Sequence, residues 1–380
     1  MRIYLDHNAT TPVRDEVAEA VARALRDLPG NPSSVHAEGA AARAALERAR
    51  AQVAALVGAA PSEVIFTSGA TEANHAALHG VVGSAGPRGA LVTTAAEHPS
   101  VEAAAAALEA QGRHVTRIGV DAQGRIDLDA FDAALARGAA LASVLLANNE
   151  TGVLQDAAGI AARTTARGVP LHLDATQAVG KVPVDAARLG AALLSASGHK
   201  FGGPKGAGFL VCRGGVALAP WLRGGPQERG RRGGTENVAG VVGLGVACEL
   251  AARELGERAA VWARLRDRLW EGIREKIPRV RRHGPPAAVL PNTLSVEFEG
   301  ADGEALLQAL DLEGVAASMG AACHSGSIEP SRILLAMGRT AAQARATLRF
   351  SVGHGVREAH VDRVLALLPD LVARAREAAA

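Results

Sequence analysis

The chain has 380 residues, of which 48% are hydrophobic and 21% charged, with a net charge of +2. This composition is that of a globular protein with a sizeable core, and the near-neutral charge gives no sign of a direct nucleic-acid or membrane partner. No apolar run approaches the roughly 18 residues that span a bilayer. Three cysteines argue against a disulfide framework and favour a reducing, cytoplasmic location.

An alanine-rich helix is expected at residues 40–60, and another at 101–110. From residue 60 to about 213, short apolar runs alternate with helical patterns, which predicts a mostly parallel sheet covered by helices on both faces. The runs are residues 64–67, 90–94, 141–147, 169–174, 192–196 and 208–212.

After residue 226 the pattern changes. A long helix is expected at 237–277, followed by a second α+β unit with a strand at 293–298 and a final helix at 356–380. We therefore divide the chain into a large domain, 16–255, and a small domain made of 1–15 and 256–380.

The segment 67–72, Thr-Ser-Gly-Ala-Thr-Glu, reads as a strand end, a tight turn and a helix start. Free backbone N–H groups and the positive end of a helix suit a phosphate. A plain helix N-cap at Ser68 or Thr71 is the alternative.

Asp174 ends the apolar run at 169–174, where a carboxylate is costly to bury without a partner. A protonated pyridine nitrogen would be such a partner. The alternative is that Asp174 caps the following helix.

Lys200 follows another buried-looking run and precedes a Gly-Gly-Pro turn, which suits a lysine that forms a Schiff base. Of 41 basic residues only four are lysines, so a surviving lysine is mildly enriched for sites where arginine cannot substitute. A solvated loop lysine is the alternative. The four lysines are Lys181, Lys200, Lys205 and Lys276.

His98 and Asn149 also follow apolar runs, so the same edge of the sheet should carry an imidazole and an amide. Arg349 alternates with apolar neighbours, as on a strand, and an inward arginine needs an anion such as a substrate carboxylate or a structural ion-pair partner.

Cys323 lies among glycines and small residues, where no apolar pattern would bury it, and His324 beside it could favour the reactive thiolate. Its surroundings lack metal-ligand spacing beyond His324, so no metal site is expected. Cys212 and Cys248 are expected to be buried packing residues.

Taken together, these segments resemble the cysteine desulfurases of the iron–sulfur-cluster and nitrogen-fixation type, within the class V, fold-type I pyridoxal-phosphate enzymes. The resemblance covers essentially the whole chain. It implies an α/β fold with a mostly parallel seven-stranded sheet in the large domain and a smaller α+β domain. The segments that carry it are 4–12, 30–34, 67–72, 97–98, 148–150, 174–177, 197–200 and 349–351.

The resemblance also implies a role for each matching residue. Lys200 would form the Schiff base, His98 would stack on the cofactor ring and Asp174 would bind its nitrogen. Cys323 would be the nucleophile of a homodimeric enzyme. For the remaining positions it implies phosphate contacts from Ala70, Thr71, Ser197 and His199 and, across the dimer interface, from Thr235; contacts to the phenolic oxygen side and the substrate from Gln177 and Asn149; and carboxylate binding by Arg349 and Asn31.

The expected reaction converts L-cysteine to L-alanine and leaves a persulfide on Cys323, which passes to a carrier or scaffold protein for iron–sulfur clusters or tRNA thiolation. The segment 317–325 departs from the commonest desulfurase pattern and is similar to the selenocysteine lyase branch, so L-selenocysteine is the alternative substrate. A catalytically silent scaffold is an alternative of another class, but Lys200, Asp174 and Cys323 are all retained.

Overall fold

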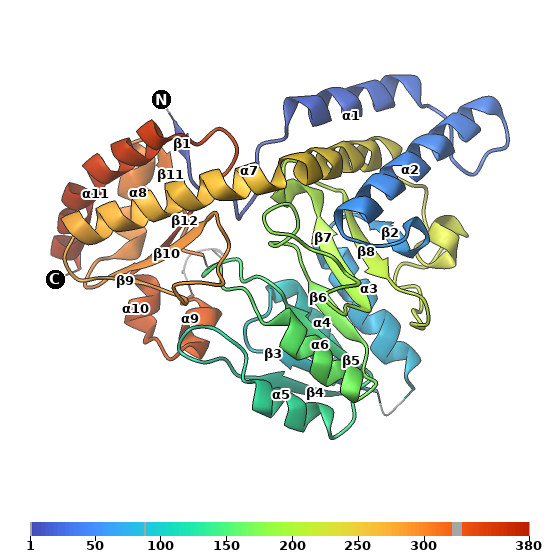
Figure 1. Ribbon diagram of the computed structural model, residues 1–380, viewed down its shortest axis with the longest axis horizontal. Coiled ribbons are helices and arrows are strands. Elements are labelled where there is room, and N and C mark those ends of the chain that lie inside the picture. Colours follow the sequence, from blue (N-terminus) through green and yellow to red (C-terminus); the bar gives the residue numbers. More distant parts are fainter. Residues whose placement is uncertain (1, 87–88, 321–328, 380) are drawn as a thin grey trace.

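The computed structural model describes residues 2–86, 89–320 and 329–379, and Figure 1 shows their arrangement. One large sheet with its helices fills one side of the molecule, and a smaller α+β unit lies at the other side (Figure 1). Across these three ranges, none of the helices has both the length and the apolar character that crossing a membrane requires.

The large sheet has seven strands in the order β2-β8-β7-β6-β5-β3-β4. Strand β8 runs antiparallel to both of its neighbours, and the other neighbouring pairs are parallel. The carboxyl ends of the parallel strands therefore share one edge. The strands are β2 (Val64–Thr67), β3 (Ala90–Thr94), β4 (His114–Ile118), β5 (Leu141–Leu145), β6 (Leu171–Asp174), β7 (Leu193–Ser197) and β8 (Gly208–Cys212).

Helices cover both faces of this sheet because successive strand residues point to opposite sides. In β7, Leu193 packs in the cluster that contains α3 and α4, whereas Leu194 packs in the cluster that contains α2, α5, α6 and part of α7. The helices of this half are α1 (Asp15–Asp27), α2 (Ala37–Leu56), α3 (Ala70–Ser84), α4 (Pro99–Ala110), α5 (Leu128–Leu135), α6 (Ala157–Ala166) and α7 (Val238–Lys276).

The smaller unit has an antiparallel sheet in the order β12-β10-β9 and a parallel pair formed by β1 and β11. The N-terminal strand β1 therefore belongs to the same unit as the C-terminal third of the chain. The elements are β1 (Ile3–Tyr4), β9 (Val280–Arg282), β10 (Thr293–Phe298), β11 (Val315–Ala316), β12 (Thr347–Ser351), α8 (Gly303–Leu312), α9 (Arg332–Ala336), α10 (Ala341–Arg345) and α11 (Glu358–Ala378).

Helix α7 is 39 residues long and contributes to two hydrophobic cores. Its first half, up to Ala251, packs in the core of the large sheet, and its second half, from Trp262, packs with β10, β12 and α11. We propose that the two domains follow these two cores, with the division inside α7 near residue 255.

Most predicted elements are present. The expected helix at 237–277 is α7, the expected strand at 293–298 is β10, and the expected C-terminal helix is α11. None of the apolar runs indicated β4, because its sequence, His-Val-Thr-Arg-Ile, is largely polar. This strand lies at the edge of the sheet, where only part of its surface is covered.

Candidate active site

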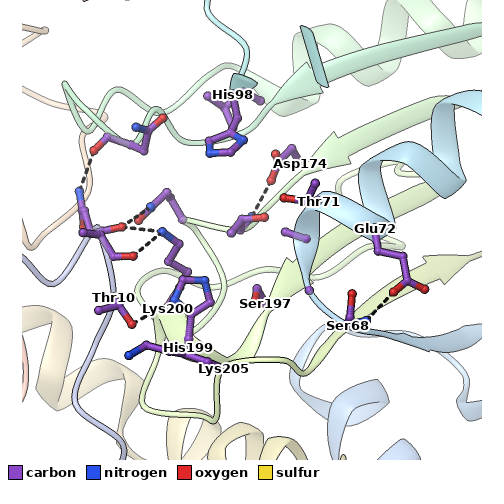
Figure 2. Close-up of a pocket in the computed structure, with 18 of the residues that line it drawn as sticks. Thr10, Ser68, Thr71, Glu72, His98, Asp174, Ser197, His199, Lys200 and Lys205 are labelled. Carbon is purple, nitrogen blue, oxygen red and sulfur yellow. Dashed lines mark hydrogen bonds between the residues drawn. The ribbon is translucent and has the colours of Figure 1, made fainter. Parts of the chain in front are cut away.

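A cavity of about 640 Å³ opens at the carboxyl ends of the parallel strands (Figure 2). Asp174 ends β6, Ser197 ends β7, and the first turn of α3 follows β2 at the same edge. Figure 2 shows His98 and Asp174 on one side of this space and Lys200 with His199 on the other. The predicted residues that line the cavity are Ala70, Thr71, His98, Asn149, Asp174, Gln177, Ser197, His199, Lys200 and Arg349.

Asp174 is 1% exposed and is held by two donors. Its Oδ2 accepts a hydrogen bond from Asn74 Nδ2 at 2.8 Å, and its Oδ1 accepts one from the Thr176 backbone N–H at 3.0 Å. A turn rather than a helix follows β6, so the helix-cap alternative for Asp174 is wrong. The carboxylate is fixed at the cavity wall, where it can face a positively charged group.

His98 is the N-cap residue of α4, and its Nδ1 accepts a hydrogen bond from the Ser100 backbone N–H at 3.1 Å. This bond leaves the proton of the neutral ring on Nε2. Burial lowers the pKa of His98, so the ring is neutral at neutral pH. Asn74 connects the two side chains, because its Nδ2 also donates to Ser100 Oγ, which lies 2.8 Å from His98 Nδ1.

The first turn of α3 forms an end of the cavity that suits an anion. The N-cap residue is Gly69, which has no side chain to cap the helix, so the N-cap alternative for Ser68 or Thr71 is wrong. The Ser68 N–H is already taken, because it donates to Glu72 Oε2 at 2.8 Å. Strand β8 touches this turn so closely that a Cβ on Gly208 would lie 2.7 Å from Gly69 Cα.

Ser197 and His199 also line the cavity, and Figure 2 shows His199 beside Lys200 and Thr10. His199 Nδ1 lies 3.1 Å from Thr10 Oγ1. Burial, followed by the nearby Lys200 charge, lowers the pKa of His199 to about 4, so this ring is a neutral hydrogen-bonding group. Lys205, a further basic residue, also lines the cavity.

Lys200 ends a short 3-10 helix, Gly198–Lys200, directly after β7. Its Nζ donates hydrogen bonds to the carbonyl oxygens of Asn8 at 2.7 Å and Ala9 at 2.9 Å, so it is not a freely solvated loop lysine. Burial and the charge of Arg349 lower the pKa of Lys200 to about 8, although Asp174 and Asp6 act in the opposite direction. A large fraction of this amine is therefore neutral near pH 8 and can act as a nucleophile or base.

Arg349 in β12 is 4% exposed and brings a guanidinium to the cavity. Its Nη2 donates to Asp6 Oδ1 at 2.6 Å, and its Nη1 donates to the Asn149 carbonyl at 2.9 Å. The structural ion pair considered for this residue is thus present. Among the described residues its buried Nε has no hydrogen-bond partner, which leaves one donor for an anion.

Gln177 is hydrogen-bonded to Asn8 and Lys181, two residues for which the sequence predicted no role. Its Nε2 donates to the Asn8 carbonyl at 2.9 Å, and its Oε1 accepts a hydrogen bond from the buried Lys181 amine. Asn8 lies within the recognised segment 4–12, and Lys181 was one of the four retained lysines, so each carried a weak signal. Asn74 carried none, because its partners lie at least 26 residues away in sequence.

The two predicted residues Asn31 and Thr235 are exposed and do not line the cavity of their own chain. Asn31 Oδ1 accepts a hydrogen bond from the Ser33 N–H at 2.9 Å, which closes a local turn. Thr235 lies three residues before α7. Their predicted contacts stay predictions.

Cys323 lies outside the described residues. Ser318 and Gly320, just before it in sequence, line the cavity. Cys212 and Cys248 are buried, as expected, and burial raises the pKa of both thiols.

Comparison with known proteins places the chain in a family. Residues 3–364 match the model of the family described as aminotransferase class-V. A cysteine desulfurase from Enterobacter agglomerans is 45% identical over 98% of this chain and 93% of its own length. A cysteine desulfurase from Cereibacter sphaeroides is 45% identical over 99% of this chain and 97% of its own length.

Solved structures agree with this result. A NifS-like protein superimposes with a TM-score of 0.92 at 34% identity, covering 98% of this chain and all of its own. A NifS-like protein from Rickettsia africae has a TM-score of 0.89 at 30% identity, with 98% and 99% of the two chains covered. The chain belongs to the class-V aminotransferase family, alongside relatives named cysteine desulfurase.

Proposed function

We propose that the protein is a pyridoxal-phosphate-dependent cysteine desulfurase. The observation that carries this proposal is the order of groups along one cavity: the Asp174 carboxylate on one side, the Lys200 amine on the other, and the uncapped start of α3 at one end. Named relatives at 45% identity support the same activity, and they do not favour the selenocysteine lyase alternative.

These residues fit pyridoxal phosphate. Asp174 would pair with the ring nitrogen, and His98 would stack on the ring. The Lys200 Nζ would bond to the aldehyde carbon of the cofactor. The phosphate would bind the N–H groups of Ala70 and Thr71. The other predicted contacts are Ser197 and His199 to the phosphate and Gln177 and Asn149 near the phenolic oxygen. When bound, the cofactor supplies an electron sink for the bond that breaks at the substrate Cα.

The chain's own residues then bind the substrate and move its protons. The Arg349 guanidinium, whose Nε has no partner in the part of the chain that the structure describes, would bind the carboxylate of L-cysteine. Lys200 Nζ, with its pKa lowered to about 8, would act as the base that removes the Cα proton of the bound substrate. His98, neutral and with its proton on Nε2, would pass a proton to or from the substrate.

The thiolate of Cys323 would attack the sulfur atom of the substrate. The substrate C–S bond would break as a new S–S bond forms on Cys323, and the three-carbon fragment would take up one proton at Cβ and regain one at Cα to leave as L-alanine. The persulfide would then be handed to a sulfur-acceptor protein in the cytoplasm, for iron–sulfur clusters or tRNA thiolation. No external oxidant is required, because the two electrons that the sulfur atoms lose in forming the S–S bond are gained by the substrate Cβ, which becomes the methyl group of alanine.

The experiment that tests this reaction measures alanine and sulfide released from L-cysteine in the presence of a reducing thiol. The Cys323→Ala variant should lose nearly all activity, whereas the matched Cys212→Ala variant, which changes a buried core thiol, should keep it. Full activity in Cys323→Ala would remove the thiol from the mechanism. A turnover on L-selenocysteine that greatly exceeds that on L-cysteine would favour the lyase alternative.

We also propose a homodimer in which Thr235 reaches the phosphate site of the partner. The exposure of Thr235 and of the nearby apolar residues Trp221 and Leu222 supports this arrangement. Subunits that carry Lys200→Ala and subunits that carry Thr235→Ala should be weakly active alone. Mixed dimers should recover activity, because one of their two sites combines an intact lysine with an intact threonine. No recovery after confirmed subunit exchange would contradict the arrangement.

A further inference from the structure

Lys181 is a fully buried lysine next to the candidate active site. Its side chain is 1% exposed, and its Nζ donates hydrogen bonds to Asn8 Oδ1 at 2.9 Å and to Gln177 Oε1. Both acceptors are uncharged amide oxygens. Within residues 2–86, 89–320 and 329–379, no carboxylate forms an ion pair with Lys181, so a positive charge here would have no countercharge.

The hydrogen bonds match a neutral amine. An uncharged lysine has two N–H bonds, and two acceptor oxygens lie within reach. Burial and the charges of Lys200 and Arg349 lower the pKa of Lys181 well below its usual value. Arginine could not take this place, because a guanidinium stays charged. This gives a physical reason for a lysine in a chain whose basic residues are mostly arginine.

The Lys181 amine determines which way the Gln177 amide faces. With Oε1 turned toward Lys181, the Gln177 Nε2 donates to the Asn8 carbonyl and keeps a second N–H at the cavity wall. A flipped amide would place Oε1 against the Asn8 carbonyl oxygen, where two acceptors repel each other, and would lose the hydrogen bond that Nε2 donates to Asn8. The same Asn8 carbonyl accepts a hydrogen bond from Lys200 Nζ at 2.7 Å.

We propose that Lys181 is a positioning residue: its neutral amine fixes the Gln177 amide so that an N–H faces the phenolic oxygen of the cofactor attached to Lys200. The inference rests on the proposed function. A donor at that oxygen stabilises its anionic form and weakens its hold on the proton of the linking nitrogen. Lys181 therefore lowers the pH at which the Lys200–cofactor linkage loses its proton.

This pH is measured as the midpoint of the change in the visible absorbance of the holoenzyme. Lys181→Met removes the donor and should raise the midpoint by roughly one pH unit. Lys181→Gln supplies a neutral N–H₂ group, so its midpoint should shift by less than half as much as that of Lys181→Met. Lys181→Arg introduces a fixed charge and should lower it. Lys276→Met, the same change at an exposed lysine, is the control and should leave it unchanged.

The route through Gln177 is tested by a double-mutant cycle. In a Gln177→Ala background, Lys181→Met should no longer move the midpoint; an undiminished shift would overturn the proposal. The cycle is needed because other titratable groups surround the amine. Lys200, His199, Arg349 and His7 interact electrostatically with Lys181, and Arg14, Arg258 and His354 line the small cavity behind it.

The outcomes separate this inference from the proposed function. A wild-type protein without a visible band that depends on Lys200 would contradict the cofactor assignment itself. A normal band with a midpoint unmoved in folded Lys181→Met would overturn only the role of Lys181, and so would a wild-type midpoint in Lys181→Arg. If Lys181→Met does not fold, the midpoints of Lys181→Gln and Lys181→Arg are compared with that of the wild type. A Lys181→Gln midpoint nearer to the wild type supports the neutral amine. A nearer Lys181→Arg midpoint would overturn the proposal, because arginine is the better replacement for a charged lysine.

Discussion

Asn74 Nδ2 in helix α3 donates a hydrogen bond to Asp174 Oδ2 at the end of β6, at 2.8 Å. The same nitrogen donates to Ser100 Oγ, which lies beside His98 Nδ1. One amide group thus fixes the carboxylate that would face the cofactor nitrogen and the imidazole that would stack on the ring. Neither side chain has to be ordered when the cofactor binds.

Asn74→Ala should weaken cofactor binding by about 1–3 kcal/mol, because the buried Asp174 carboxylate loses one of its two donors. The measurement is the dissociation constant of pyridoxal phosphate, followed by absorbance. The surface change Gln52→Ala, which removes an amide bonded to Glu249, is the control and should have no effect. An unchanged constant in Asn74→Ala would show that Asp174 does not need this donor.

Arg349→Lys should raise KM for L-cysteine about 10- to 100-fold, because an ammonium group cannot reproduce the planar fork of donors. The visible absorbance of the bound cofactor should change little. Arg357→Lys, at an exposed position, is the matched control. If kcat fell instead while KM stayed constant, Arg349 would act on the chemical step rather than on binding.

The rate of cofactor attachment to the cofactor-free protein should follow the neutral fraction of Lys200. With a pKa of about 8, this fraction rises tenfold per pH unit below pH 8 and levels off above it. For a lysine with its usual pKa, the neutral fraction would keep rising up to about pH 10. Arg349→Met removes a neighbouring cation, so the pKa of Lys200 should rise and the rate profile should move to higher pH. Stopped-flow absorbance at a series of pH values gives both profiles.

Gly208→Ala should destabilise the protein and weaken phosphate binding, since the new Cβ would lie 2.7 Å from both the Ala196 carbonyl oxygen and Gly69 Cα. Overpacking of this kind typically costs about 1–3 kcal/mol. Gly83→Ala is the control, because it lies in α3 with no atom within 4 Å of its added Cβ, and it should stabilise the helix slightly. Thermal unfolding of both variants, with and without inorganic phosphate, separates the two effects.

The strand-end position of Asp174, Ser197 and Lys200 could be predicted from sequence because parallel strands deliver their carboxyl ends to one edge of the sheet. The hydrogen bonds that hold these residues in place could not be predicted from sequence. Lys200 bonds to carbonyl groups 191 and 192 positions earlier in the chain, and Lys181 bonds to Asn8 across 173 positions. Such contacts depend on where the N-terminal segment crosses the finished sheet, which no local pattern encodes.

Strand β4 shows the same limit in the fold. Its largely polar sequence contains no apolar run, because an edge strand needs only one neighbour and partial burial. The antiparallel direction of β8 also follows from the path of the chain rather than from the composition of the strand.

Helix α7 makes the two halves of the molecule mechanically dependent on each other. At 39 residues it is about 58 Å long, and its backbone runs unbroken from one hydrophobic core into the other. Because α7 residues up to Ala251 pack in one core and those from Trp262 pack in the other, a cut near residue 255 would separate the two cores and remove the continuous helix that joins them. Any hinge motion between the halves would have to bend this rod, and Gly256, an open glycine near its centre, is the weakest point along it.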